Sequence, residues 1–145
     1  MLYFDYSATT PVDDSVLDTF VKVSKQYWAN PNSMHSIGRE AHELMEESAK
    51  QIASLLKVKP SEVIFTSSAS EANNMALKGI CYKYKNRSKH IITTELEHSS
   101  TSEAVKFLKD DGFAVHYVKL NDNGAIDLED LERLLDTYKP IIVSI

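Results

Sequence analysis

The spacing of apolar residues along the chain changes near residue 60. Before that point, apolar side chains recur at helical intervals and predict a helix within residues 11–28, capped by Asp13 or Asp14. The stretch "ANPNSMHS" then favours a turn, because proline and asparagine interrupt a helix. A second amphipathic helix is predicted from Ser36, as its cap, to about Lys57. Two helices separated by a turn are therefore expected between residues 11 and 57.

After residue 60, short apolar runs alternate with amphipathic segments. The runs predict strands and the segments between them predict helices, the first of which has Ala72, Met75, Ala76, Gly79 and Ile80 on its inward face. The strands are expected at 62–66, 90–94, 114–120 and 140–145, and the helices at 70–85, 100–110 and 127–138. This alternation predicts an α/β fold with a mostly parallel sheet and flanking helices.

The last predicted strand, "PIIVSI", has no covering helix after it. Parallel strands are normally covered on both faces. We therefore expect an incomplete domain that is cut short.

Composition narrows the classes of function. The 145 residues are 43% hydrophobic and 26% charged, with a net charge of −5, which argues against nucleic-acid binding and against a basic membrane surface. The single cysteine, Cys81, cannot form an internal disulfide, and the N-terminus lacks the features of a signal peptide. No apolar stretch is long enough to span a bilayer. A cytoplasmic protein without a membrane segment is predicted.

The junction "TSSAS" joins a predicted strand to a predicted helix. Ser67, Ser68 and Ser70 offer hydroxyls there, and the first N–H groups of a helix have no partner within the helix. Such an N-terminus can hold a phosphate group, around Ala69 and Ser70. Simple capping by Ser70, with Glu71 in the first turn, explains the same residues. The junction alone favours capping.

His98 ends "TTELEHSS", again between a predicted strand and a predicted helix. Both junctions are expected at the same edge of the sheet, so His98 could stack on a flat ligand or move protons there. A surface histidine near a helix start is the alternative.

No metal site is predicted from the remaining histidines, which have no ligand-like spacing with cysteine or carboxylates: His35, His42, His90 and His116. Cys81 is expected to be packed in the core.

Five segments occur together in one order and spacing: "YFDYSATTPV", "NPNSMHSIGREA", "EVIFTSSASEANNMALKG", "HIITTELEHSS" and "NDNGAIDLEDLE". In this the chain resembles the N-terminal portion of cysteine desulfurases of the NifS/IscS type. These are enzymes of the class V aminotransferase group that depend on pyridoxal 5′-phosphate (PLP). The resemblance covers essentially all 145 residues.

The resemblance implies part of the large domain of an aspartate aminotransferase-like PLP transferase. Residues 1–13 would form an N-terminal arm on the small-domain side, and residues 14–145 a partial PLP-binding large domain. Ala69 and Ser70 would hold the PLP phosphate, and His98 would stack on the pyridine ring and assist proton transfer. The family's "NPxSxH" loop, with Asn30, Asn32 and His35, and its arm at residues 8–10 receive no firm role.

For the whole enzyme, the resemblance implies a homodimer that converts L-cysteine to L-alanine. Sulfur would pass through an enzyme persulfide to a scaffold protein for iron–sulfur cluster or thio-cofactor assembly. The family's Schiff-base lysine and persulfide cysteine are not among these residues, so this chain by itself is predicted to be inactive. The alternatives are another class V enzyme, such as a selenocysteine lyase or an aminotransferase, or a non-catalytic fragment that pairs through an exposed sheet edge.

Two further expectations come from departures from the family pattern. Ser68 stands where the family usually has glycine, and a left-handed backbone at this position would make serine strained. In the family sheet, the strand corresponding to residues 62–66 is separated from the strand corresponding to residues 141–145 by strands that come later in the sequence. The strands present here are therefore not expected to form the family's complete sheet.

Overall fold

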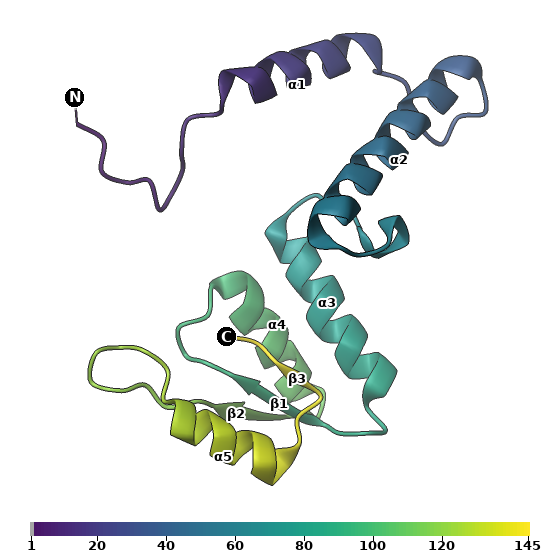
Figure 1. Ribbon diagram of the computed structural model, residues 1–145. Helices are drawn as coiled ribbons and strands as arrows, with labels where there is room; N and C mark the ends of the chain where they lie inside the picture. The colour runs from purple at the N-terminus through teal and green to yellow at the C-terminus, as the bar shows by residue number, and fades with distance from the viewer. Residues whose placement is uncertain (1) are drawn as a thin grey trace. The chain divides into compact units, whose positions relative to one another are not determined.

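A computed structural model describes residues 2–145, which group into two compact units that meet between Ile64 and Phe65 (Figure 1). The first unit is helical, and the second contains the parallel sheet. This boundary differs in position from the predicted boundary between an arm and a partial large domain at residue 13, which stays a prediction.

The first unit contains the helices α1 (Asp14–Gln26) and α2 (Ser36–Leu56) and the short 3₁₀ helix η1 (Pro60–Glu62). Asp13 caps α1, as predicted, by accepting a hydrogen bond of 2.9 Å from the Ser15 backbone N–H. The predicted cap of α2 is wrong by one residue. His35 is the cap, because its Nδ1 accepts a hydrogen bond of 3.2 Å from the Gly38 N–H, and Ser36 is already helical.

The "NPNSMH" loop packs closely on the first turn of α2. A side-chain Cβ built on Gly38 would lie 2.5 Å from the Ser33 carbonyl oxygen and 2.9 Å from that of Asn30. The loop holds its own shape through hydrogen bonds from the Ser33 and Asn32 N–H groups to Asn30, 3.0 and 2.9 Å long. Glycine is therefore required at position 38 by the close approach of the loop backbone.

The second unit alternates helices and strands (Figure 1). Its sheet is fully parallel in the order β2-β1-β3, with His90 paired to Ala114 at one end and Ile92 to Val143. In chain order its elements are α3 (Ala69–Tyr84), β1 (His90–Thr93), α4 (Ser99–Asp110), β2 (Ala114–Tyr117), α5 (Leu128–Tyr138) and β3 (Ile142–Val143). The predicted α/β class, with a parallel sheet and flanking helices, is confirmed.

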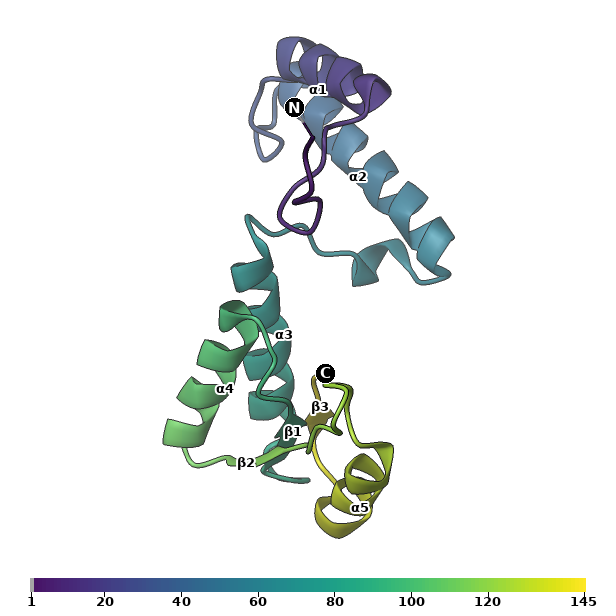
Figure 2. The ribbon, with the colours of Figure 1, turned by 90° about the vertical axis from the view of Figure 1, so that its left-hand side faces the viewer.

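Helices cover both faces of this sheet. Figure 2 shows α3 and α4 on one side of the strands and α5 on the other. Ile91 contributes to the core on the α3 and α4 side, and Ile92 to the core on the α5 side. The central strand β1 is buried on both faces, which explains its two consecutive isoleucines, Ile91 and Ile92.

The strand predicted at 62–66 does not form. Glu62 ends η1, residues 63–66 have no regular structure, and Ile64 and Phe65 are 64% and 52% exposed. A strand needs a neighbouring backbone to pair with. Within residues 2–145 this segment has none.

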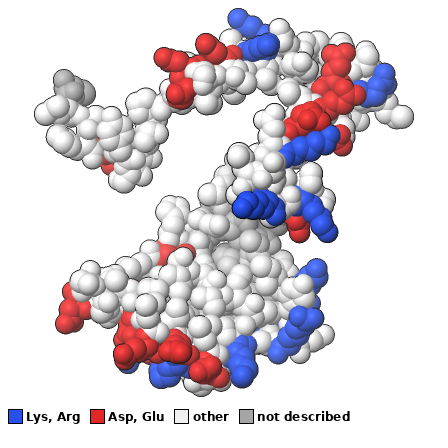
Figure 3. All heavy atoms as spheres, viewed as in Figure 1, with Lys and Arg blue, Asp and Glu red and all other residues white. Residues whose placement is uncertain are grey.

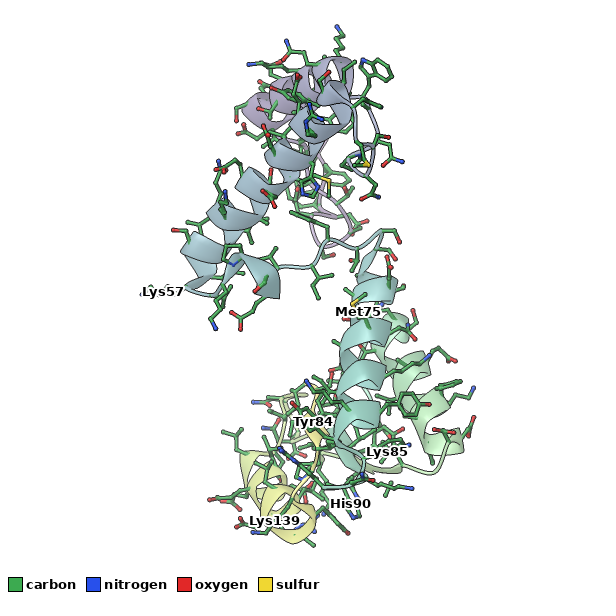
Figure 4. The ribbon with its side chains drawn as sticks, turned by 90° about the vertical axis from the view of Figure 1, so that its right-hand side faces the viewer. Lys57, Met75, Tyr84, Lys85, His90 and Lys139 are labelled. Atoms are coloured by element: carbon green, nitrogen blue, oxygen red, sulfur yellow. The ribbon has the colours of Figure 1, made fainter. Side chains whose placement is uncertain are left out.

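The predicted inward face of α3 is also wrong. Met75, Ala76, Gly79 and Ile80 are exposed, whereas Leu77 and Cys81 are buried. The buried stripe faces α4 and β1, so long-range packing selected a different side of a helix whose two sides are both fairly apolar. Figure 4 shows Met75 and Tyr84 on this helix.

Two lysines end helices in the left-handed conformation. Lys57 follows α2 with φ 55°, and Lys139 follows α5 with φ 45°; both are marked in Figure 4. Asp127 caps the start of α5, and acidic side chains gather over this helix in Figure 3. Among residues 2–145, no helix combines the length and the apolar character that crossing a membrane requires.

Candidate functional site

The start of α3 is held in place by its own polar side chains. Ser68 is the N-cap and accepts a 3.3 Å hydrogen bond from the Glu71 N–H. The Glu71 carboxylate turns back and accepts bonds from the Ser67 N–H at 2.7 Å and from the Ser67 hydroxyl at 2.8 Å. This reciprocal arrangement fixes the entry into the helix.

The same hydrogen bonds keep Glu71 charged. The bond from the Ser67 backbone N–H, followed by the one from its hydroxyl, holds the pKa of the Glu71 carboxyl below its usual range. The carboxylate therefore stays ionised to a lower pH than that of an ordinary glutamate.

The next two residues leave hydrogen-bond donors free. Within residues 2–145, the backbone N–H groups of Ala69 and Ser70 and the Ser70 hydroxyl have no hydrogen-bond partner, and both residues are exposed. These donors stand at the positive end of the α3 dipole. Their arrangement suits an anion with several oxygen atoms, such as a phosphate group.

The cap and the free donors are therefore on two different serines. The sequence favoured Ser70 as the cap, but Ser68 has that role and Ser70 lies inside the first turn. Ser68 has φ −166°, an extended backbone that any residue adopts, so the expected strain from the missing glycine does not arise. Ser70 thereby keeps its hydroxyl available.

His98 stands at the start of the neighbouring helix. It is the N-cap of α4, and its Nδ1 accepts a hydrogen bond of 3.1 Å from the Ser100 N–H. The Ser100 hydroxyl lies 2.9 Å from the same nitrogen. The imidazole is exposed, so a face of the ring is open to a flat ligand.

The structure joins the two predicted junctions through residues that sequence reasoning missed. The Asn73 amide, one turn into α3, donates to the Ser100 hydroxyl at 2.9 Å and to the Thr101 hydroxyl at 3.2 Å. In Figure 2 the N-terminal ends of α3 and α4 lie at the same end of the second unit. No local signal in the sequence identified Asn73, because its partners are 27 and 28 residues away.

Other candidate residues have structural roles. Cys81 is fully buried, and burial raises the pKa of its thiol to about 11, so it is packed as predicted and is not a thiolate at neutral pH. Asn30, Asn32 and His35 shape the loop before α2 in the first unit. In the part of the chain that the structure describes, no three His, Cys, Asp or Glu side chains group as metal ligands.

His90 and His116 form a pair on the α5 face of the sheet. Their Nδ1 and Nε2 atoms are 2.9 Å apart, and the His116 ring stacks on Tyr138 at 3.7 Å between centroids. Burial, followed by the charge of His90, lowers the pKa of His116. The pair is part of the packing beneath α5.

The residues present fit PLP. Two free backbone N–H groups and one hydroxyl at a helix N-terminus match the donors that a phosphate monoester accepts from. An exposed imidazole at the adjoining helix start can stack on a pyridine ring. Ala69 and Ser70 would hold the phosphate, and His98 would contact the ring.

Comparisons with known proteins show which family this chain is similar to. The model of the aminotransferase class-V family matches residues 2–145. A mitochondrial cysteine desulfurase of Eremothecium gossypii is 44% identical over 135 residues, which make up 92% of this chain and 28% of that protein.

Solved structures give the same result. One described as a NifS-like protein has a TM-score of 0.82 and 41% identity, covering 90% of this chain and 36% of its own. A structure of SspA in complex with cysteine has a TM-score of 0.81 and 33% identity, covering 97% and 40%. This chain thus spans about a third of the length of the proteins it is similar to. It belongs to the aminotransferase class-V family, and its resemblance to cysteine desulfurases of the NifS type is confirmed.

Proposed function

We propose that residues 1–145 are the part of a PLP-dependent cysteine desulfurase that holds the phosphate and the ring of the cofactor. The observation that carries the proposal is the set of free donors on Ala69 and Ser70, at the same end of the unit as the exposed ring of His98. The relative from Eremothecium gossypii is named a cysteine desulfurase, and the SspA structure contains cysteine. Both names support L-cysteine as the substrate.

In this assignment, each residue has a binding role. The Ala69 and Ser70 N–H groups and the Ser70 hydroxyl would neutralise the phosphate, and His98 would orient the ring by stacking. When bound, PLP supplies the electron sink that allows the carbon–sulfur bond of cysteine to break. L-Cysteine would become L-alanine, and the sulfur would leave through a persulfide toward iron–sulfur cluster or thio-cofactor assembly.

The sulfur-accepting cysteine of this enzyme is not Cys81. A persulfide acceptor must be an accessible thiolate, whereas Cys81 is fully buried with a raised pKa. By its resemblance to the family, the reaction takes its acceptor cysteine and its Schiff-base lysine from outside these 145 residues. The family also implies a homodimer and a scaffold protein as sulfur acceptor.

The phosphate assignment can be tested by NMR on the ¹⁵N-labelled chain. The probe is pyridoxine 5′-phosphate, which has the ring and phosphate but no aldehyde, so it does not react with surface lysines. We expect the amide signals of Ala69 and Ser70 to shift with this probe and with inorganic phosphate. The His98 ring signals should shift only with the probe. Ser70→Ala should weaken binding roughly fivefold, the effect of one lost hydrogen bond.

The control ligand is pyridoxine, which lacks the phosphate and should leave both amides unchanged. Shifts spread over the lysine-rich surface, with residues 69 and 70 unaffected, would contradict the assignment. In a parallel assay, residues 1–145 with PLP, L-cysteine and a thiol reductant should release no sulfide. Sulfide release would contradict the proposal that the reaction needs groups from outside these residues.

A second enzyme of the same family, acting on selenocysteine, would use the same phosphate site. Comparing sulfide and selenide release from the two amino acids by a protein that also carries the family's lysine and cysteine motifs distinguishes the two activities. Either activity would leave the phosphate assignment intact, provided that the protein binds pyridoxine 5′-phosphate through Ala69 and Ser70.

A further inference from the structure

The hydrogen bonds of His98 define which ring nitrogen carries the proton. A backbone N–H can only donate, and the Ser100 N–H points to His98 Nδ1 at 3.1 Å. In the neutral ring, Nδ1 must therefore be the acceptor, and the hydrogen is on Nε2. The Ser100 hydroxyl, 2.9 Å from Nδ1, then donates as well.

Asn73 directs the Ser100 hydroxyl. Its amide N–H₂ donates to the Ser100 oxygen at 2.9 Å, so that oxygen already receives one hydrogen and turns its own toward Nδ1. A second bond of 3.2 Å from the same amide to the buried Thr101 hydroxyl fixes the orientation of the Asn73 side chain. The direction of donation thus runs from Asn73 through Ser100 to His98.

This relay of hydrogen bonds, from Asn73 through Ser100 to His98, also links α3 to α4. Asn73 follows Ser70 by three residues, so the helix that offers the free phosphate donors also holds the histidine of the next helix. The two helices pack through Leu77 and Cys81 of α3 and Leu108 of α4, which are buried. Packing keeps the helices together, and Asn73 adds hydrogen bonds from α3 to the first turn of α4.

We propose that Asn73 and Ser100 are positioning residues that lock His98 in the Nε2–H tautomer. As a consequence, His98 offers its ring face and an Nε2–H donor, while its basic nitrogen is occupied within the protein. A neutral His98 then cannot take up a proton at Nε2, which narrows the proton-transfer role suggested by the family resemblance. The role toward the cofactor rests on the proposed function, whereas the tautomer does not.

Long-range ¹H–¹⁵N correlation spectra of the histidine rings test the tautomer directly. They are recorded on the ¹⁵N-labelled chain at about pH 8, where an ordinary imidazole is neutral. We expect Nδ1 of His98 at the position of an unprotonated nitrogen and Nε2 at that of a protonated one. Ser100→Ala should lower the ratio of the Nε2–H to the Nδ1–H tautomer about fivefold, since one donor is lost.

Two variants test whether the tautomer depends on the direction of hydrogen-bond donation or only on the presence of a neighbouring side chain. Ser100→Thr keeps a hydroxyl and should restore the wild-type ratio. Asn73→Asp has nearly the same shape but accepts instead of donating, so the Ser100 hydroxyl should turn to the new carboxylate and the ratio should fall. Ser102→Ala, which removes an exposed hydroxyl from the same helix, should leave the ratio unchanged.

Averaged nitrogen signals in the wild type, or an Nδ1–H tautomer, would overturn the proposal. So would an unchanged ratio in both Ser100→Ala and Asn73→Asp. Pyridoxine 5′-phosphate distinguishes this failure from failure of the proposed function. If the amides of Ala69 and Ser70 respond to the probe while the tautomer is not locked, only the relay is wrong. A locked tautomer without any response at these amides leaves the relay in place and rejects the cofactor assignment.

Discussion

Two buried threonines near α4 differ by one hydrogen bond. Thr93, at the end of β1, is 2% exposed, and its hydroxyl has no partner within the residues described. Thr101, in the first turn of α4, is 6% exposed, and its hydroxyl accepts from the Asn73 amide. A buried hydroxyl without a partner destabilises the fold, whereas a bonded one contributes to its stability.

Replacing each hydroxyl by a methyl group should therefore have opposite effects. Thr93→Val keeps the shape and removes an unsatisfied group, so the free energy of unfolding should rise by about 1 kcal/mol. Thr101→Val breaks the bond from Asn73 and should lower it by about 1 kcal/mol. Urea denaturation followed by circular dichroism measures both. A loss of stability in Thr93→Val would mean that its hydroxyl does have a partner.

At the scale of single residues, the sequence predicted the candidates better than their roles. Ala69, Ser70 and His98 lie at helix starts, as expected, because capping residues and small side chains act locally. The exchange of roles between Ser68 and Ser70 was missed, since both can cap a helix and only the actual chain path decides between them. Asn73 and Ser100 were missed because they are 27 residues apart in sequence.

At the scale of elements, the glycines of α2 and α3 occupy opposite environments. Gly38 faces the Ser33 carbonyl oxygen, which would be 2.5 Å from an added Cβ. Gly79 lies in α3, is exposed, and has no atom within 4 Å of the same position. Glycine is needed at the first position and only weakens the helix at the second.

We therefore expect alanine to destabilise α2 and stabilise α3. Gly38→Ala should lower the free energy of unfolding by about 1–3 kcal/mol, because the loop backbone must move. Gly79→Ala should raise it by about 0.5–1 kcal/mol through helix propensity. Thermal unfolding followed at 222 nm, the wavelength of helical dichroism, gives the sign of each change. Equal effects of the two substitutions would show that the loop does not press on Gly38.

At the scale of the whole molecule, groups of the second unit with lowered pKa values make stability depend on pH, among them His116 and Asp130. Burial and the neighbouring His90 lower the pKa of His116 in the folded state. Asp130 is buried, and hydrogen bonds from the Lys119 N–H and from Arg133 lower the pKa of its carboxyl. In both cases the unfolded chain binds a proton at a higher pH than the folded chain does.

Stability should therefore fall in two steps as the solution is acidified. The His116 contribution is complete above pH 6.5, its ordinary pKa, and is lost as pH falls from there through the folded pKa. The Asp130 contribution is complete above pH 3.8 and is lost below it in the same way. Urea denaturation at a series of pH values should show both steps. His116→Thr should remove the upper step, and Asp130→Asn should reduce the lower one, to which Glu71 also contributes. If the upper step persists in His116→Thr, another group causes it.

The sequence by itself determined the helices, the parallel α/β class and the family. These follow from apolar periodicity, from caps and turns, and from motifs in a given order, all of which are properties of neighbouring residues. Only the tertiary structure decided that residues 63–66 stay unpaired, that Leu77 and Cys81 form the inner side of α3, and that Asn73 reaches Ser100. The physical reason is that backbone pairing, burial and hydrogen bonding across helices depend on partners far away in sequence. A local pattern contains no information about which partners these are.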